Sequence, residues 1–220
     1  MEFKDLSKEQ KGWFISGFAA GESYFLVRPL FRKTKKGFSR VIWQFRWGIQ
    51  LRDDDQKILD DIKDFFIQRG CKTLTCTRKK RKNLASGNYT VCAEGYKNGV
   101  FIREFFNEFP LITKKQTDFI TWSTVLDELL TINSESLEIK DREYTQAEIE
   151  RRLYICFLSD QLRIGRVNSS MLDLGVLNLI QGSPGQHKLH VMRFLQFLLS
   201  NSVLTKSEVA NMYNKFRVKI

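Results

Sequence analysis

The sequence predicts an α+β fold: an αββαββα unit with a saddle-shaped antiparallel sheet, plus a helical C-terminal extension. Two pairs of segments alternate in polarity with the period of a β-strand, and segments with helical spacing precede, separate and follow these pairs. Helices are expected to cover one face of the four-stranded sheet and to leave the other face polar. We expect residues 1–131 to form the core and residues 132–220 the extension.

The composition indicates a globular chain. Of the 220 residues, 42% are hydrophobic, 13% are aromatic and only 3 are proline, which excludes a disordered or proline-rich chain. No apolar run approaches the roughly 20 residues that cross a bilayer, and the N-terminus resembles neither a secretory signal nor a transit peptide. The four cysteines, Cys71, Cys76, Cys92 and Cys156, form no CxxC pair and are expected to be reduced core thiols. An intracellular protein is therefore predicted.

The charge predicts a polyanionic partner. The chain has 36 Lys and Arg against 25 Asp and Glu, a net charge of +11, which favours nucleic acid over a membrane surface. Residues 1–131 carry 24 basic and 16 acidic side chains, and basic clusters occur in both expected hairpin loops, at residues 32–40 and 78–82. One such cluster is as often a solvated turn, but two in equivalent places favour nucleic-acid binding by the N-terminal part.

The first helix is expected from Ser7 to about Ala20. Ser7 and Gln10 have the capping-box spacing that satisfies free N–H groups at a helix start. One face is mostly small and consists of Trp13, Ser16, Gly17, Ala20 and Gly21. A face of this kind lets another helix backbone approach closely, whereas Phe14 and Phe18, on another face, are expected to enter the core of the chain.

Two amphipathic strands follow, at residues 23–32 and 40–51. Their alternation places apolar side chains on one side, and Arg and Gln residues on the other. An ordinary solvent-facing surface would include carboxylates, yet between Glu22 and Asp53 the sequence has no Asp or Glu. This outer face is therefore expected to contact an anion.

Residues 53–131 complete the predicted core. Asp53–Asp55 open a helix that Gly70 closes. A second hairpin is expected to pair residues 71–78 with 88–93, with threonines and an asparagine on its polar side. Two further helices are expected at residues 99–109, where Pro110 stops the first of them, and at residues 117–130.

The C-terminal part is expected to be helical. Capping-box spacing occurs at Thr145 with Glu148, at Thr205 with Glu208, and approximately at Ser170 with Asp173. His187 and His190 are spaced HxxH, but without a third ligand no metal site is expected. The extension is expected mainly to brace the core. The alternative is contact with flanking DNA through Arg151, Arg152, Arg163 and Arg166.

The segment Trp13–Phe25, WFISGFAAGESYF, resembles the signature helix of the LAGLIDADG homing endonucleases. The αββαββα order over residues 7–131 resembles their repeat unit, and Pro110–Gln116, PLITKKQ, resembles the start of its next helix. No second copy follows Ile132. In this family a chain with one motif is one half of the working nuclease. The resemblance therefore implies a homodimer whose signature helices pack along the small face.

The resemblance also implies a metal site at the end of this helix, held by Glu22 and the carbonyl of Gly21. Glu22 is expected just beyond the helix C-terminus, where the macrodipole is negative, and its twofold mate would lie nearby. A divalent cation would relieve the repulsion between Glu22 and the negative helix end, and also the repulsion between the two glutamates. Oxygen ligands suit Mg²⁺, although Mn²⁺ or Ca²⁺ could occupy the site. The motif departs from the family at Ala20, where an acidic residue is common.

The implied reaction is hydrolysis of one phosphodiester in each strand of duplex DNA. Lys115, five residues after Pro110, resembles the active-site lysine of the family, with Lys114 as the alternative. The family often has a glutamine near the end of the second strand. The nearest one here is Gln50, although the best spacing falls on Leu51.

Recognition of a long, pseudo-palindromic target is implied on the outer face of the sheet. A twisted sheet can follow the major groove, with arginines toward guanine, Gln44 toward adenine and loop lysines on phosphates. The expected DNA contacts are Arg28, Arg32, Lys33, Lys35, Lys36, Arg40, Gln44, Arg46, Thr73, Thr75, Thr77, Arg78, Lys80, Asn88 and Thr90.

Two other functions fit the same scaffold. An RNA maturase that assists intron splicing would keep the basic sheet without needing Glu22. A non-cleaving DNA-binding regulator would need neither Glu22 nor Lys115. The resemblance further implies an intron-encoded protein, which would act in a chloroplast or mitochondrion if its gene is organellar and otherwise in the bacterial cytoplasm.

Overall fold

The structure, a computed structural model, describes residues 2–33, 39–79, 87–136, 144–164, 169–181 and 189–217. The chain forms two compact units. The first contains residues 1–26 and 45–126, and the second contains residues 27–44 and 127–220. The far part of the first hairpin thus belongs with the C-terminal helices. The boundary at residue 131 stays a prediction.

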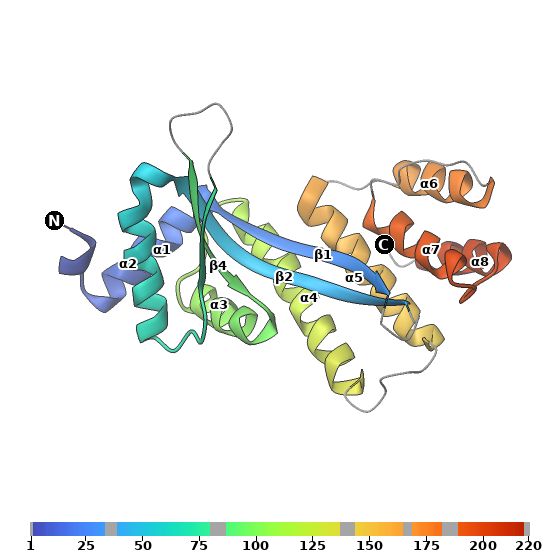
Figure 1. Ribbon diagram of the computed structural model, residues 1–220, viewed down its shortest axis with the longest axis horizontal. Coiled ribbons are helices and arrows are strands. Elements are labelled where there is room, and N and C mark those ends of the chain that lie inside the picture. Colours follow the sequence, from blue (N-terminus) through green and yellow to red (C-terminus); the bar gives the residue numbers. More distant parts are fainter. Residues whose placement is uncertain are drawn as a thin grey trace. The chain divides into compact units, whose positions relative to one another are not determined.

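The order of elements matches the predicted α+β pattern (Figure 1). The elements are η1 (Phe3–Asp5), α1 (Lys8–Glu22), β1 (Ser23–Lys33), β2 (Ser39–Arg52), η2 (Asp53–Asp55), α2 (Gln56–Gln68), β3 (Thr75–Lys79), β4 (Asn88–Glu94), α3 (Tyr96–Glu108), α4 (Lys115–Ser136), α5 (Gln146–Ile164), α6 (Ser169–Gln181), α7 (His190–Ser200) and α8 (Lys206–Arg217). The strands form one antiparallel sheet in the order β1-β2-β4-β3. The predicted fold class is confirmed. No described helix is both long and apolar enough to span a bilayer.

Helix α1 begins as predicted but ends later. The Ser7 hydroxyl accepts the N–H of Gln10 at 3.2 Å, and the Gln10 side chain accepts the N–H of Ser7 at 2.8 Å, which completes a capping box. At the other end the hydroxyl of Ser23 donates to the carbonyl of Ala19 at 2.6 Å. Glu22 is therefore the last residue of the helix, not the residue beyond it.

The core-facing side of α1 differs from the prediction. Gly12, Ile15, Ser16 and Ala19 are buried, whereas Phe14 remains 39% exposed. A Cβ on Gly12 would lie 2.4 Å from the ring of Phe109. The helix therefore packs closely through its small residues. The expectation that Phe14 and Phe18 enter the core was wrong, because it assumed that the largest side chains of the helix face the core. The small side chains do so instead, since they let the helix approach its neighbours closely.

Aromatic side chains dominate the core of the first unit. The rings of Phe45 and Trp122 stack with centroids 4.2 Å apart, and Trp47 meets Phe66 edge-on at 5.6 Å. Trp47, Phe66 and Trp122 are fully buried. The alternation predicted for the second strand is confirmed, because its apolar positions from Val41 to Ile49 are buried.

The second hairpin is shorter than predicted. Strand β3 begins at Thr75, because the side-chain amide of Asn98 donates to both the carbonyl and the hydroxyl of Thr73 and holds that segment outside the ladder. All residues of β3 are exposed, as suits an edge strand. Cys76 lies in β3 and is exposed, so it is not a core thiol, although the other three cysteines are buried and all four are free.

The second unit contains the predicted C-terminal helices. The capping box at Thr145 is present, with the Thr145 N–H donating to Glu148 at 2.8 Å, and Thr205 makes the same arrangement at the start of α8. Helix α6 is described from Ser169, within one residue of the approximate cap spacing at Ser170, and the residues before it lie outside the described set. The capping boxes predicted at Thr145 and Thr205 are confirmed.

Candidate active site and nucleic-acid interface

The end of α1 presents an open surface. Gly21 and Glu22 are exposed, and a Cβ added to Gly17 or to Gly21 would meet no atom within 4 Å. Within the described part of the chain, Glu22 makes no hydrogen bond or ion pair. Its carboxylate is thus available to a ligand or to another molecule.

The donor atoms at this helix end suit a hard divalent cation. The carbonyl of Gly21 belongs to the last turn, where carbonyls lack a partner within the helix, and Glu22 adds carboxylate oxygens. Mg²⁺ prefers such oxygen donors and keeps several waters. Among the described residues, no three His, Cys, Asp or Glu side chains lie close enough together to hold a metal ion.

The other two candidate catalytic residues lie on different elements. Lys115 is the first residue of α4, and its ammonium lies 3.6 Å from a carboxylate oxygen of Asp118. Gln50 is exposed on β2, opposite Thr90 of β4. In the residues that the structure describes, no hydrogen bond or ion pair joins Glu22, Lys115 and Gln50 to one another.

The predicted dimer face is partly buried inside the chain. Ser16 is buried, and its hydroxyl donates to the carbonyl of Pro110 at 2.8 Å, so it was wrongly assigned to an outer face. Trp13 is 49% exposed and packs edge-on against Phe109 at 5.4 Å. Ala20 is half-buried, and the two glycines of the face are exposed. The outer surface of α1 thus combines exposed aromatic rings with uncovered glycines.

Arg46 is held in place on the outer face of the sheet. Its guanidinium lies 2.9 Å from the carboxylate of Glu94, which is its direct cross-strand neighbour. Gly48 lets the ring of Tyr24 lie close to the sheet, since a Cβ there would be 2.7 Å from the phenol oxygen. Burial raises the pKa of Tyr24, and a hydrogen bond from Arg46 opposes that rise. Sequence reasoning missed Glu94, because only the strand register pairs it with Arg46.

The predicted contacts on the second hairpin point to different sides. Thr77 faces Thr90 across the ladder, and Thr75 has its hydroxyl 2.9 Å from the sulfur of Cys92. Arg78 lies opposite Tyr89, and its guanidinium donates to Asp53 at 2.9 Å, which lowers the pKa of that carboxyl. Thr73 precedes the strand. Thr75, Thr77, Thr90 and Asn88 thus lie in the ladder, whereas Thr73 lies outside it and Arg78 forms an ion pair with Asp53.

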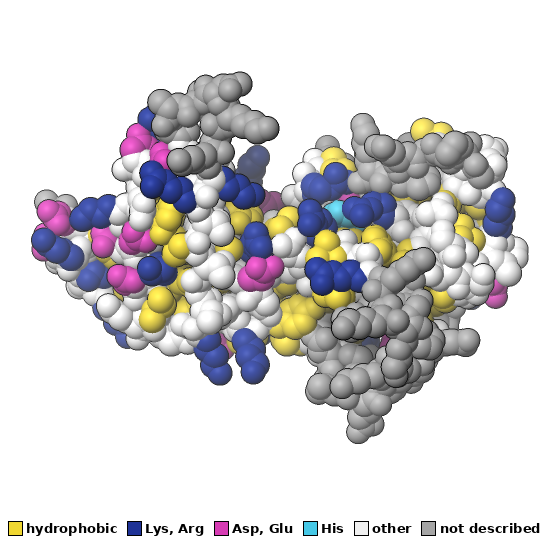
Figure 2. Space-filling view, viewed as in Figure 1, with side chains coloured by type: hydrophobic (Ala, Val, Ile, Leu, Met, Phe, Trp, Pro, Cys, Tyr) yellow, Lys and Arg dark blue, Asp and Glu magenta, His cyan; other side chains and the backbone are white. Residues whose placement is uncertain are grey.

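The remaining predicted DNA contacts lie in the second unit or outside the described residues. Arg28 and Arg32 are exposed on β1, and Gln44 is half-buried on β2. The side chains outside the described set are those of Lys33, Lys35, Lys36, Arg40 and Lys80. Figure 2 shows Lys and Arg side chains on the visible face of each unit.

The arginines suggested for the C-terminal part have different environments. Arg151 pairs with Glu128 at 3.3 Å. Arg152 is buried, and its guanidinium lies 4.8 Å from the centroid of the Tyr144 ring. Arg163 is exposed, and Arg166 lies outside the described residues. Arg151 and Arg152 therefore stabilise the second unit itself and are poor candidates for DNA contact.

The described part of the chain combines a four-stranded antiparallel sheet, on which Arg28 and Arg32 are exposed, with a helix that ends at the exposed Glu22. The sequence model of the family described as LAGLIDADG endonuclease matches residues 15–126, just over half of the chain. The chain therefore belongs to the LAGLIDADG endonuclease family. Among curated proteins, no sequence matches it.

Solved structures with the same fold include two homing endonucleases. The LAGLIDADG homing endonuclease I-GzeII, in complex with its DNA target, is 20% identical with a TM-score of 0.53, over 74% of this chain and 48% of its own. The homing endonuclease I-TnaI is 22% identical with a TM-score of 0.51, over 77% of this chain and 95% of its own. The chain thus spans about half the length of I-GzeII and nearly all of I-TnaI.

Proposed function

We propose that this protein is a site-specific double-stranded DNA endonuclease that acts as a homodimer with Mg²⁺. The observation that carries the proposal is the exposed, unpaired Glu22 at the end of α1, in a chain that matches the endonuclease family from residue 15, within that helix, to residue 126. A long, pseudo-palindromic target follows from twofold symmetry. Origin from an intron, and action in an organelle or a bacterial cytoplasm, belong to the same proposal.

The homodimer is supported by the open glycines of α1 and by the exposed Glu22 at its end. The chain spans about half the length of I-GzeII and nearly all of I-TnaI. Glu22 alone is a poor cation site, whereas two copies would supply two carboxylates. Gly17 and Gly21 leave open space on α1, and glycines of this kind let a second helix approach closely.

Glu22 and the Gly21 carbonyl would hold the cation, which when bound activates a water molecule and stabilises the leaving oxygen. Lys115 would place its ammonium beside the scissile phosphate and stabilise the charge that develops there. Its ion pair with Asp118 holds the side chain at the start of α4 before DNA binds. Gln50 offers an exposed amide at the end of β2 for orienting the reacting groups.

DNA recognition is assigned to the outer face of the sheet. The exposed Arg28 and Arg32 would reach base edges or phosphates, and Glu94 orients Arg46. A bidentate arginine contact with guanine contributes about 1–3 kcal/mol of discrimination. The lysine-rich loops would add contacts to the phosphate backbone, which fix position without reading sequence.

The direct test is selection of cut sites from a library of random duplexes in the presence of Mg²⁺. The protein should produce discrete double-strand breaks at one family of related sites. Glu22→Gln should bind the same duplexes with similar affinity but not cut them, because the amide cannot replace the carboxylate at the cation. Cutting that survives Glu22→Gln would refute the site. Splicing assistance by Glu22→Gln, without cutting by the natural chain, would favour an RNA maturase.

A further inference from the structure

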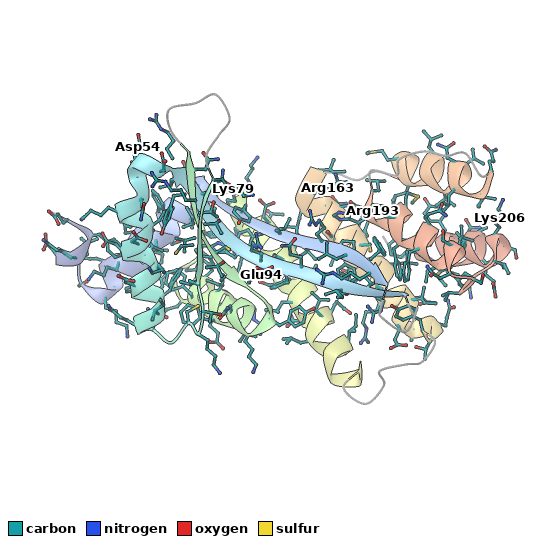
Figure 3. All side chains as sticks on the ribbon, in the orientation of Figure 1. Asp54, Lys79, Glu94, Arg163, Arg193 and Lys206 are labelled. Atoms are coloured by element: carbon teal, nitrogen blue, oxygen red, sulfur yellow. The ribbon has the colours of Figure 1, made fainter. Side chains whose placement is uncertain are left out.

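A pocket of about 560 Å³ lies in the first unit, between the start of α1 and the end of α2. Small-molecule sites have volumes of roughly 300–1,000 Å³. The pocket is at the C-terminal end of α2, whereas Asp54, labelled in Figure 3, lies just before the other end of this helix. The lining residues are Lys8, Lys11, Phe65, Gln68 and Arg69. None of these side chains is acidic, and three of them are cationic.

Helical spacing brings the lining residues together from two helices. Lys8 and Lys11 are three residues apart in α1, and Phe65 and Gln68 are three residues apart in α2, so each pair shares one face of its helix. Phe3 connects the two faces. Its ring meets that of Phe65 edge-on at 6.3 Å, and the ammonium of Lys11 lies 5.6 Å from its centroid. The pocket is therefore built into the packing of α1 against α2.

Arg69, the residue that caps the end of α2, forms a fixed wall of the pocket. Its guanidinium lies within 5.8 Å of the centroids of three rings, those of Phe65, Phe105 and Phe109. Its Nη2 pairs with Glu108, whereas its Nη1 is buried and has no hydrogen-bond partner among the described residues. Buried donors without a partner are rare in folded proteins. Arg69 thus keeps hydrogen-bonding capacity that Glu108 does not use.

Positive charge in this pocket exceeds negative charge. Among the described residues, Lys8 and Lys11 form no ion pair, and Glu108 compensates Arg69 alone. Lys11 donates to the carbonyl of Lys4 at 3.1 Å, which orients its ammonium and leaves two further protons for other acceptors. The pocket thus combines two uncompensated ammonium groups with a fixed guanidinium and a side-chain amide. Donors of these kinds bind phosphate oxygens.

The pocket lies on the helix side of the sheet. Phe66 of α2 meets the ring of Trp47 edge-on at 5.6 Å, and Trp47 is adjacent in β2 to Arg46, which projects from the opposite face. The DNA contacts predicted on β2 and β4 are therefore on the other side of the sheet. Exposed carboxylates directly follow or precede lining residues in the chain, namely those of Glu9 and Asp64. They would repel a long polyanion, whereas a single phosphate group can contact the cations alone.

We propose that this pocket binds the phosphate group of a small ligand. Lys8 and Lys11 contact the phosphate oxygens from α1, and Arg69 contacts them from the end of α2, through charge-assisted hydrogen bonds. The ligand is either inorganic phosphate or a phosphorylated small molecule such as a nucleotide, to which Phe65 offers an apolar contact. The site goes beyond the proposed function and does not depend on it.

The test is calorimetric titration of the full-length chain with inorganic phosphate and, separately, with adenosine monophosphate, at an ionic strength held constant with sodium chloride. Lys8→Gln and Lys11→Gln should each weaken binding about tenfold, because each variant loses one charge-assisted hydrogen bond. Lys97→Gln is the matched control, since Lys97 is an exposed lysine of the same unit on α3, and it should keep the natural affinity. Tighter binding of adenosine monophosphate than of phosphate would assign the pocket to nucleotides.

Further measurements separate the pocket from folding and from other anion sites. Lys8→Arg keeps the charge and should retain most of the affinity, and the ligand-free Gln variants should melt at the natural temperature because neither lysine forms an ion pair. If both Gln variants keep the natural affinity, phosphate binds elsewhere and the inference fails. It also fails if neither probe binds the natural chain. Duplex RNA whose binding depends on these lysines, without binding of either probe, would overturn it in favour of an RNA surface.

Discussion

Arg46 and Glu94 face each other directly across β2 and β4, with 2.9 Å between guanidinium nitrogen and carboxylate oxygen. The pair lies on a sheet face whose first two strands contain no acidic residue. Glu94 therefore has two effects. It holds Arg46 in one orientation, and it places a negative charge where DNA phosphates and bases are expected.

Replacing Glu94 should strengthen the affinity for DNA and weaken the discrimination between DNA sequences. In Glu94→Gln, binding to DNA of arbitrary sequence should strengthen several-fold, because one repulsive charge is removed from the surface. Discrimination at the base pair that Arg46 contacts should weaken, by up to the roughly 1–3 kcal/mol of a bidentate contact. Stability should change by less than about 1 kcal/mol, since the pair is partly exposed. Binding titrations on target and scrambled duplexes measure both effects.

Glu104→Gln is the matched control, because Glu104 is an exposed carboxylate on α3. It should leave both affinity and discrimination close to the natural values. Equal effects of the two variants would mean that net charge alone matters and that Arg46 is not oriented by Glu94.

The two glycines Gly12 and Gly17 of α1 should respond to substitution in opposite ways. Nothing lies within 4 Å of a Cβ on Gly17, so Gly17→Leu should fold, and its helix should gain up to about 1 kcal/mol from improved propensity. The same side chain would block the close approach of a second α1. Sedimentation should therefore show a loss of dimer, together with a melting temperature of the monomer that does not fall.

Gly12→Ala gives the reverse outcome. Its Cβ would lie 2.4 Å from the Phe109 ring, and overpacking of this kind costs about 1–3 kcal/mol. The chain should lose stability, while the surface for dimer contact is unchanged. A stable Gly17→Leu protein that still dimerises would place the interface elsewhere.

The sequence was sufficient for the elements whose signals are local. The capping boxes at Ser7, Thr145 and Thr205 each begin a helix, and strict alternation placed the first two strands within one or two residues. These features depend on neighbours a few residues apart in the chain, so their physics is visible without tertiary structure.

Long-range contacts account for what the sequence could not predict. Ser16 was expected to face a second copy of α1, but its hydroxyl donates to the carbonyl of Pro110, 94 residues away. Glu94 is placed opposite Arg46 only by the strand register. His190 was considered as a metal ligand, yet it bonds to Ser159 inside the second unit. In each case the partner lies far along the chain, and no spacing rule identifies it.

His190 should make the stability of the second unit sensitive to acid. Its pKa is lowered from an ordinary 6.5 to about 4, first by burial and then by Arg163, Arg193 and Arg28. The unfolded chain therefore binds a proton at a higher pH than the folded chain. By linkage, the free energy of unfolding is unaffected above about pH 6.5, decreases as pH falls toward 4, and changes no further below that.

The size of this effect is set by the pKa difference. Each pKa unit corresponds to about 1.4 kcal/mol, so the full loss is about 3 kcal/mol between pH 6.5 and 4. Asp160 opposes this loss of stability, since burial raises the pKa of that carboxyl and the folded state then gains a proton in acid.

Comparison with His190→Asn isolates the histidine, because the amide can still donate to Ser159 but does not titrate. Denaturant unfolding from pH 7 to 4 should show a steeper fall in stability for the natural chain than for His190→Asn. Parallel curves would mean that His190 is protonated as readily in the folded chain as in the unfolded one.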